Sequence, residues 1–260
     1  MWGAIIGDIV GSRFEFNNYK GKDFEFFTPY NRITDDSVMT IAIAKAFLES
    51  KNKEEVSANA VKWMRSLGQK YLDAGYGGRF LRWLITKNPQ PYNSWGNGSA
   101  MRVSAVGYVA TTAVEVIELS RRVTEVTHNH PEGLKGAEAT AMAIFMARNG
   151  FAKELIASAM SEYYDLDFKL DDIRADYDFE IGCQGTLPPA IVAFLEAGSF
   201  EDAIRNAISI GGDSDTLAAI TGAIAEVYFG IPEELKTKAR FYIPTDLVEI
   251  VDAFEQKYQQ

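Results

Sequence analysis

The sequence has 260 residues, of which 47% are hydrophobic, and its formal net charge is −10 at neutral pH. This length suits one large domain or at most two small ones, and it can bury a core without disulfides or a structural metal. The acidic balance disfavours general binding to nucleic acids or anionic membranes, which need basic surfaces.

The cysteine content and the N-terminal stretch indicate a compartment. The single cysteine, Cys183, excludes an intramolecular disulfide and a multi-cysteine zinc cluster. The opening MWGAIIGDIVGS has no basic leader, and Asp8 interrupts its apolar run, so no signal peptide is predicted. No window approaches the ~20 uninterrupted apolar residues of a membrane span. We therefore expect a soluble, cytoplasmic protein that does not bind membranes.

Apolar residues recur at helical spacing almost from end to end, which predicts an all-α fold. Helix stop signals such as Gly150 and start signals such as Pro188 support this interpretation. The acidic stretch 165–186 is less periodic and predicts a long connection, after which helical patterns resume. We expect one domain over residues 1–260. The expected helices cover residues 3–13, 35–50, 54–73, 78–86, 99–111, 114–127, 132–149, 152–164, 187–197, 200–209, 214–229, 232–241 and 245–258.

Two stretches place several oxygen-bearing side chains where a loop turns into a helix. They are ITDDS at 33–37 and GGDSDT at 211–216. Helix capping accounts for one such residue at each start and leaves a surplus. Together the stretches offer carboxylates and threonine hydroxyls, the oxygen ligands that Mg²⁺ or Mn²⁺ prefers. The two stretches must meet in space to form a site, and otherwise capping explains them.

Adjacent aspartates at a helix start point about 100° apart. Asp35 and Asp36 therefore suit two neighbouring ions better than one. The second stretch is not an EF-hand, because DSDTLAAITGAI lacks the oxygen ligands and the glycine that this calcium loop needs.

The first expected helix carries glycines at every fourth position, Gly3, Gly7 and Gly11. Each costs roughly 1 kcal/mol of helix propensity relative to alanine, so this face predicts close packing against another helix. Asp8 and Glu15 lie on or beyond this helix. They are either part of the acidic site or solvent-facing acids.

Two further stretches offer groups for a ligand. The loop NSWGNGSAMR, residues 93–102, is of the kind whose backbone N–H groups bind phosphate, with Arg102 as a fixed positive charge, but it is neither a Walker loop nor a G-x-G-x-x-G motif. The stretch VTHNHPEG holds both histidines, His128 and His130. Their spacing makes zinc binding improbable, and a ligand contact or a structural role is expected instead.

Five motifs in this order resemble the ADP-ribosylglycohydrolase family, which includes the dinitrogenase reductase-activating glycohydrolase and the ADP-ribosyl-arginine and ADP-ribosyl-serine hydrolases. They are GDIVGSRFE, ITDDSVM, GNGSAMR, THNHP and GGDSDTLAAITGA, and they span residues 7 to 223. The resemblance implies an orthogonal helical bundle around two Mg²⁺ ions, with Mn²⁺ as the alternative. It also implies hydrolysis of the bond between C1″ of ADP-ribose and an acceptor atom.

Carried over by position, the resemblance implies three sets of residues. The metal ligands are Thr34, Asp35, Asp36, Asp213, Asp215 and Thr216. The substrate-binding residues are Asp35, Ser94, Trp95, Gly96, Asn97, Gly98, Ser99 and His128. The catalytic acids are Asp35, Asp36, Glu15 and Asp213, of which Glu15 matches a mobile acid and the general base is not identified. Ser37 departs from the family, which often has threonine there.

Two other functions stay open on the sequence. One is a non-catalytic ADP-ribose-binding or structural member, and the other is a metal-dependent phosphohydrolase acting on a nucleotide diphosphate. The acceptor is equally open: arginine, serine, a nucleic-acid base or a small molecule. Residues 17–31 and 165–186, which are expected to shape acceptor choice, carry no recognisable motif.

Overall fold

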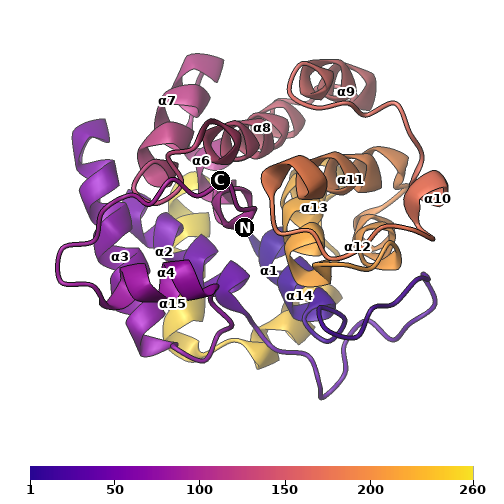
Figure 1. Cartoon of the computed structure of the whole chain (residues 1–260), viewed down its shortest axis with the longest axis horizontal. Helices are drawn as coiled ribbons and strands as arrows, with labels where there is room; N and C mark the ends of the chain where they lie inside the picture. The colour runs from indigo at the N-terminus through magenta and orange to yellow at the C-terminus, as the bar shows by residue number, and fades with distance from the viewer. Residues whose placement is uncertain (260) are drawn as a thin grey trace.

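Helices α1 (Trp2–Gly11) and α13 (Ser214–Phe229) cross near the middle of the protein, with other helices arranged around them (Figure 1). The computed structural model describes residues 1–259. Every residue of α1 is buried, as are all but the last three of α13. The pair therefore forms the centre of the hydrophobic core.

The remaining elements of the described chain are helical, and no β-sheet forms within residues 1–259. The prediction of an all-α fold is confirmed. In the first half the helices are α2 (Asp35–Glu49), η1 (Lys53–Glu55), α3 (Val56–Lys70), α4 (Gly78–Ile85), α5 (Gly98–Met101), α6 (Ser104–Val109) and α7 (Ala113–Thr124). In the second half they are α8 (Pro131–Arg148), α9 (Lys153–Ser161), α10 (Leu170–Ile173), α11 (Cys183–Glu196), α12 (Phe200–Ser209), α14 (Glu233–Ala239), η2 (Arg240–Tyr242) and α15 (Thr245–Tyr258). Among residues 1–259, none of the helices has both the length and the apolar composition needed to cross a bilayer.

The glycine face of α1 lies directly against α13, which confirms the predicted close packing. A Cβ atom at Gly7 would lie 2.0 Å from the carbonyl oxygen of Ala218, and one at Gly3 would lie 2.1 Å from that of Gly222. Real side chains cannot approach backbone this closely, so only glycine permits the crossing at this distance. The crossing brings Asp8, on α1, toward the start of α13.

The structure corrects three element boundaries. The expected helix at 99–111 is two helices, α5 and α6, separated at Arg102 and Val103. Helix α11 begins at Cys183, so Pro188, which was expected near the start of the helix, lies inside it. The next residue, Pro189, has no N–H to donate to the carbonyl of Gly185. The Tyr177 hydroxyl donates to that carbonyl instead, at 3.1 Å. The connection at 165–186 contains the short helix α10, which is too brief to give a periodic signal.

Candidate active site

The starts of α2 and α13 meet in space. The hydroxyl of Thr216 donates a hydrogen bond to Oδ2 of Asp36 at 3.2 Å, across 180 residues of sequence. The turn into α13 depends on Gly211 and Gly212, whose φ angles of 73° and 72° favour glycine. The two aspartate-rich stretches are thus parts of one site, as the metal hypothesis requires.

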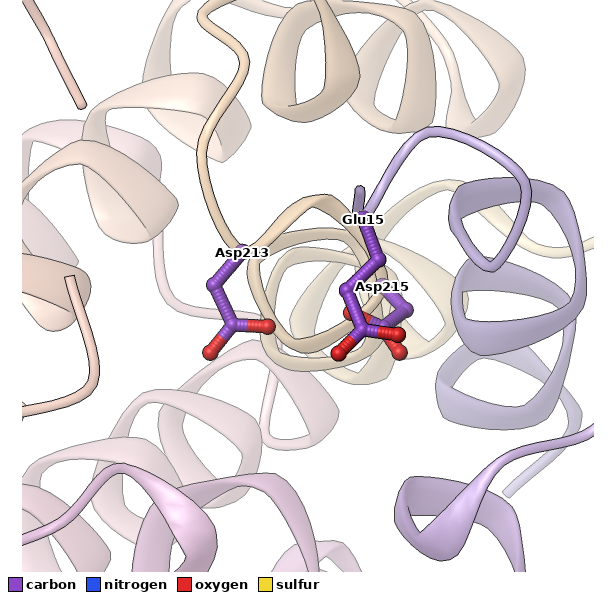
Figure 2. A group of neighbouring side chains, drawn as sticks. All are labelled: Glu15, Asp213 and Asp215. Carbon is purple, nitrogen blue, oxygen red and sulfur yellow. The ribbon is translucent and has the colours of Figure 1, made fainter. Parts of the chain in front are cut away.

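Glu15 joins this site from the loop that follows α1. Carboxylate oxygens of Glu15, Asp213 and Asp215 lie within 4.8 Å of one another. Figure 2 shows the Glu15 side chain extending toward the Asp215 carboxylate, with Asp213 at the same end of α13. We call these three residues, together with Asp35 and Asp36, the acidic cluster.

Asp8 holds the start of α2 in place through hydrogen bonds to the residues on either side of Asp35 and Asp36. Its carboxylate accepts hydrogen bonds from the backbone N–H and hydroxyl of Thr34, at 2.9 and 2.7 Å, and from the N–H of Ser37 at 3.0 Å. The Ser37 hydroxyl also donates to it. Asp8 is fully buried, so the interpretation as a solvent-facing acid is wrong. The sequence offered one signal for this role, the position of Asp8 between the glycines of a buried helix face.

Burial and mutual repulsion disfavour the ionised carboxylates of the acidic cluster. Burial is the largest cause and raises the pKa of Glu15 to about 8, with the Asp215 carboxylate adding to the effect. Burial likewise raises the pKa of Asp213 to about 6. The pKa values of Asp35, Asp36 and Asp215 are raised well above their usual range, first by burial and then by neighbouring carboxylates. In the part of the chain that the structure describes, none of these acids forms an ion pair.

These residues fit a hard divalent cation. Oδ1 of Asp36 is buried and has no hydrogen-bond partner among residues 1–259, so a strong acceptor is unsatisfied in the middle of the site. The surrounding donors are carboxylate and hydroxyl oxygens, which suit Mg²⁺ and Mn²⁺. A cation would satisfy that oxygen and offset the repulsion within the acidic cluster. The predicted ligand Thr34 caps α2, and its hydroxyl accepts from the N–H of Asp36 at 3.3 Å.

The loop at residues 94–98, here called the glycine loop, is joined to both the acidic cluster and the start of α11. The side-chain amide of Asn97 donates to Oδ2 of Asp213 at 2.7 Å and to the Thr186 hydroxyl at 3.1 Å. Gly96 and Gly182 form an isolated antiparallel bridge. The connection at 165–186, which has no recognisable motif, therefore holds one side of the site.

The predicted phosphate cradle of the glycine loop is only partly available. The N–H of Gly96 donates to the Ser94 hydroxyl at 3.2 Å, and that of Asn97 donates to the carbonyl of Ile181 at 2.8 Å. The buried Ser99 hydroxyl donates a hydrogen bond to the carbonyl of Gly96 at 3.1 Å. Trp95 is half exposed, packs beside Gly182 and lies outside the main cleft.

One cleft, with a volume of about 440 Å³, connects these parts. The acidic cluster and Thr216 line one end, and the glycine loop with His128 and Arg102 lines another part. Phe16 and Phe179 also line it, and their rings stack 6.0 Å apart. His130, by contrast, caps α8, its Nδ1 accepting from the N–H of Glu132 at 3.1 Å.

Comparison with known proteins gives consistent matches. A family model described as ADP-ribosylglycohydrolase matches residues 1–260. ADP-ribosylhydrolase ARH3 of Homo sapiens is 24% identical over 95% of this chain and 89% of that protein. ADP-ribosylarginine hydrolase Tri1 of Pseudomonas putida (strain GB-1) is 26% identical over 89% of this chain and 70% of that protein. A solved structure of an "ADP-ribosylglycohydrolase-related protein complex" aligns with a TM-score of 0.65 and 24% identity, over 93% of this chain and 96% of that one, which shows a shared fold.

Proposed function

Because the chain belongs to the ADP-ribosylglycohydrolase family, whose members remove ADP-ribose from modified acceptors, we propose that it cleaves the bond between C1″ of ADP-ribose and the acceptor atom with two divalent cations. Mg²⁺ is the proposed ion, and Mn²⁺ is the alternative. The observation that supports this proposal best is the hydrogen bond between Thr216 and Asp36, which unites two oxygen-rich helix starts in one cleft.

The proposed ligands are the side chains gathered at these two helix starts. They are Thr34, Asp35, Asp36, Asp213, Asp215 and Thr216. Bound divalent cations supply Lewis-acid stabilisation of negative charge and lower the pKa of a coordinated water. Asp8 supports this set by fixing Thr34 and Ser37, and Asn97 supports it by donating to Asp213.

The remaining residues of the cleft have distinct proposed tasks. Glu15 differs from the other acids because it lies on the loop after α1 and not at the start of a helix, and it is only partly buried, so it is the proposed proton acceptor for the attacking water. Asp35 and Asp36 are the competing candidates. The glycine loop and His128 line the part of the cleft proposed for the ribose and diphosphate.

A panel assay tests this function. Arginine-, serine- and DNA-linked ADP-ribose would each be incubated with the full chain and Mg²⁺, or with EDTA, and the products separated by chromatography. Release of intact ADP-ribose that EDTA abolishes supports the proposal, and the substrate that turns over identifies the acceptor class.

Two outcomes contradict it. Formation of AMP and ribose phosphate would assign phosphohydrolysis to the site instead. Tight binding of ADP-ribose with no turnover of any substrate in the panel, including O-acetyl-ADP-ribose, would indicate a non-catalytic member.

A further inference from the structure

Arg102 is a buried cation without an anionic partner. Its side chain is 1% exposed, and it forms no ion pair within residues 1–259. Its Nε is buried without a hydrogen-bond partner among these residues. Burial of an unpaired charge is costly, so a native protein that retains one gains something from it.

The one side-chain hydrogen bond that Arg102 makes in the described chain leads to His128. Nη2 of Arg102 donates to the Thr127 hydroxyl oxygen at 2.6 Å, and that oxygen lies 2.7 Å from Nδ1 of His128. Arginine has donors and no acceptor. The Thr127 oxygen therefore accepts from Arg102, and its own proton must go elsewhere.

Two acceptors lie within reach of the Thr127 hydroxyl proton. The carbonyl of Thr124 is 3.5 Å away and already accepts from the backbone N–H groups of Thr127 and His128, at 3.1 and 2.9 Å. Nδ1 of His128 is nearer and has no other hydrogen-bond partner in the described chain. A carbonyl has two lone pairs, so the Thr127 hydroxyl donates to the imidazole.

This order of donors determines which nitrogen of the His128 ring carries the proton. If Nδ1 accepts, the proton of the neutral ring resides on Nε2. Nε2 faces the glycine loop, since it lies 3.6 Å from the position of a Cβ at Gly96 and 3.5 Å from one at Gly98. No described residue hydrogen-bonds to it, and His128 lines the cleft.

We infer that Arg102 is a positioning residue that acts through the Thr127 hydroxyl and holds His128 as a neutral Nε2–H donor aimed at an oxygen atom of the ligand. Burial, followed by the charges of Arg102 and Arg79, lowers the pKa of His128 well below its usual value, which agrees with a neutral ring. This inference rests on the proposed function only for the identity of the ligand, which is ADP-ribose.

Nuclear magnetic resonance of histidine labelled with ¹⁵N tests the tautomer directly, because the chain has only two histidines. The full chain would be measured with Mg²⁺ between pH 6 and 8, and His130→Gln would identify the signals of His128. We expect a proton on Nε2 and none on Nδ1 throughout this range. A proton on Nδ1 in the unmodified protein would overturn the inference.

Two variants separate positioning from simple packing. Thr127→Val keeps the shape but removes the hydroxyl, and it should move the proton toward Nδ1 or mix the two tautomers, whereas Thr127→Ser should retain Nε2–H. Arg102→Met removes one of the two arginine charges that, after burial, lower the pKa of His128, so this pKa should rise, which titration extended to lower pH would follow. An unchanged tautomer in Thr127→Val, or an unchanged titration in folded Arg102→Met, would contradict the proposed relay.

Calorimetric titration with free ADP-ribose tests the use of the donor. We expect Thr127→Val to bind about tenfold more weakly than the unmodified protein, and Thr127→Ser to bind within about twofold of it. Equal affinity for Thr127→Val would overturn the donor role. If the unmodified protein shows the Nε2–H tautomer but does not bind ADP-ribose, the proposed function fails while the positioning of His128 stands.

Discussion

The Asp8 carboxylate accepts hydrogen bonds from both the N–H and the hydroxyl of Thr34, at 2.9 and 2.7 Å. A residue inside α1 thus determines where the residue that caps α2 is held. The acidic cluster depends on this contact, because Asp35 and Asp36 follow Thr34 directly.

Asp8→Asn should destabilise the protein by about 2–4 kcal/mol, since an amide cannot satisfy the donors of Thr34 and Ser37 that the carboxylate satisfies. Release of ADP-ribose should fall at least tenfold, because the start of α2 would shift. Urea unfolding followed by circular dichroism measures the first effect. Asp167→Asn is the control, since Asp167 is exposed, and it should change stability by less than about 0.5 kcal/mol. Equal stability of Asp8→Asn and the unmodified protein would show that Asp8 does not hold α2.

Asp36→Asn should abolish hydrolysis, by roughly a thousandfold or more, without loss of fold. Its Oδ1 has no hydrogen-bond partner among residues 1–259 and its carboxylate faces other acids, so removal of the charge should leave the metal-free protein equally or more stable. The distinguishing measurement is the melting temperature with and without Mg²⁺. The unmodified protein should gain stability from the ion and Asp36→Asn should gain much less. Near-normal turnover of the variant would show that Asp36 is not an essential metal ligand.

Stability of the metal-free protein should fall as pH rises from 5 to 8. The folded-state pKa values of Asp213 and Glu15 are raised, to about 6 and about 8, so each carboxyl is most favourable while it is protonated. Each contribution is lost between the ordinary pKa of the carboxyl and its raised value; for the buried Asp213 the total is on the order of 3 kcal/mol, of which about 1.4 kcal/mol is lost above pH 5, and Glu15 extends the loss toward pH 8. Melting in EDTA across this range provides the test.

Melting measured with Mg²⁺ should show that the increase in stability caused by the ion grows as the pH rises. Because the cation competes with protons for the carboxylates, its stabilisation should be larger at pH 8 than at pH 5. Asp213→Asn should flatten the pH dependence in EDTA. A metal-free protein that becomes more stable over this range would contradict the repulsion described for the acidic cluster.

Gly7→Ala should destabilise the protein by about 3 kcal/mol or more, because the new Cβ would lie 2.0 Å from the Ala218 carbonyl oxygen and would force α1 and α13 apart. Gly198→Ala is the matched control. Its Cβ would meet nothing nearer than 4.0 Å, so this change should be neutral or slightly stabilising. Chemical denaturation of the two variants compares them. Similar stability of both would show that the crossing tolerates a wider spacing.

The sequence predicted the features that local chemistry determines. Helical periodicity is a local property, and so are the oxygen-rich starts at Asp35 and Asp213, which is why both appear where they were expected. The glycine face of α1 predicted close packing but could not name α13 as the partner. Partner choice depends on contacts between distant parts of the chain, which one sequence does not display.

The missed features share this cause. Burial of Asp8 follows from the position of α2, and the pairing of Gly96 with Gly182 joins segments that carry no common pattern. Pro188 was expected at a helix start because proline usually stands there, whereas α11 had already begun at Cys183. The carbonyl of Gly185, which Pro189 cannot engage, receives a hydrogen bond from Tyr177, a distant compensation that sequence reasoning does not reveal.

The backbone pairing of Gly96 with Gly182 also restricts how the stretch between α10 and α11 can vary. Since Gly182 must run alongside Gly96, and the N–H of Cys183 must reach the carbonyl of Trp95 at 3.1 Å, the span from the end of α10 has a fixed reach. Each residue covers at most ~3.6 Å of extended chain. A deletion in this stretch would therefore draw the glycine loop away from Asp213.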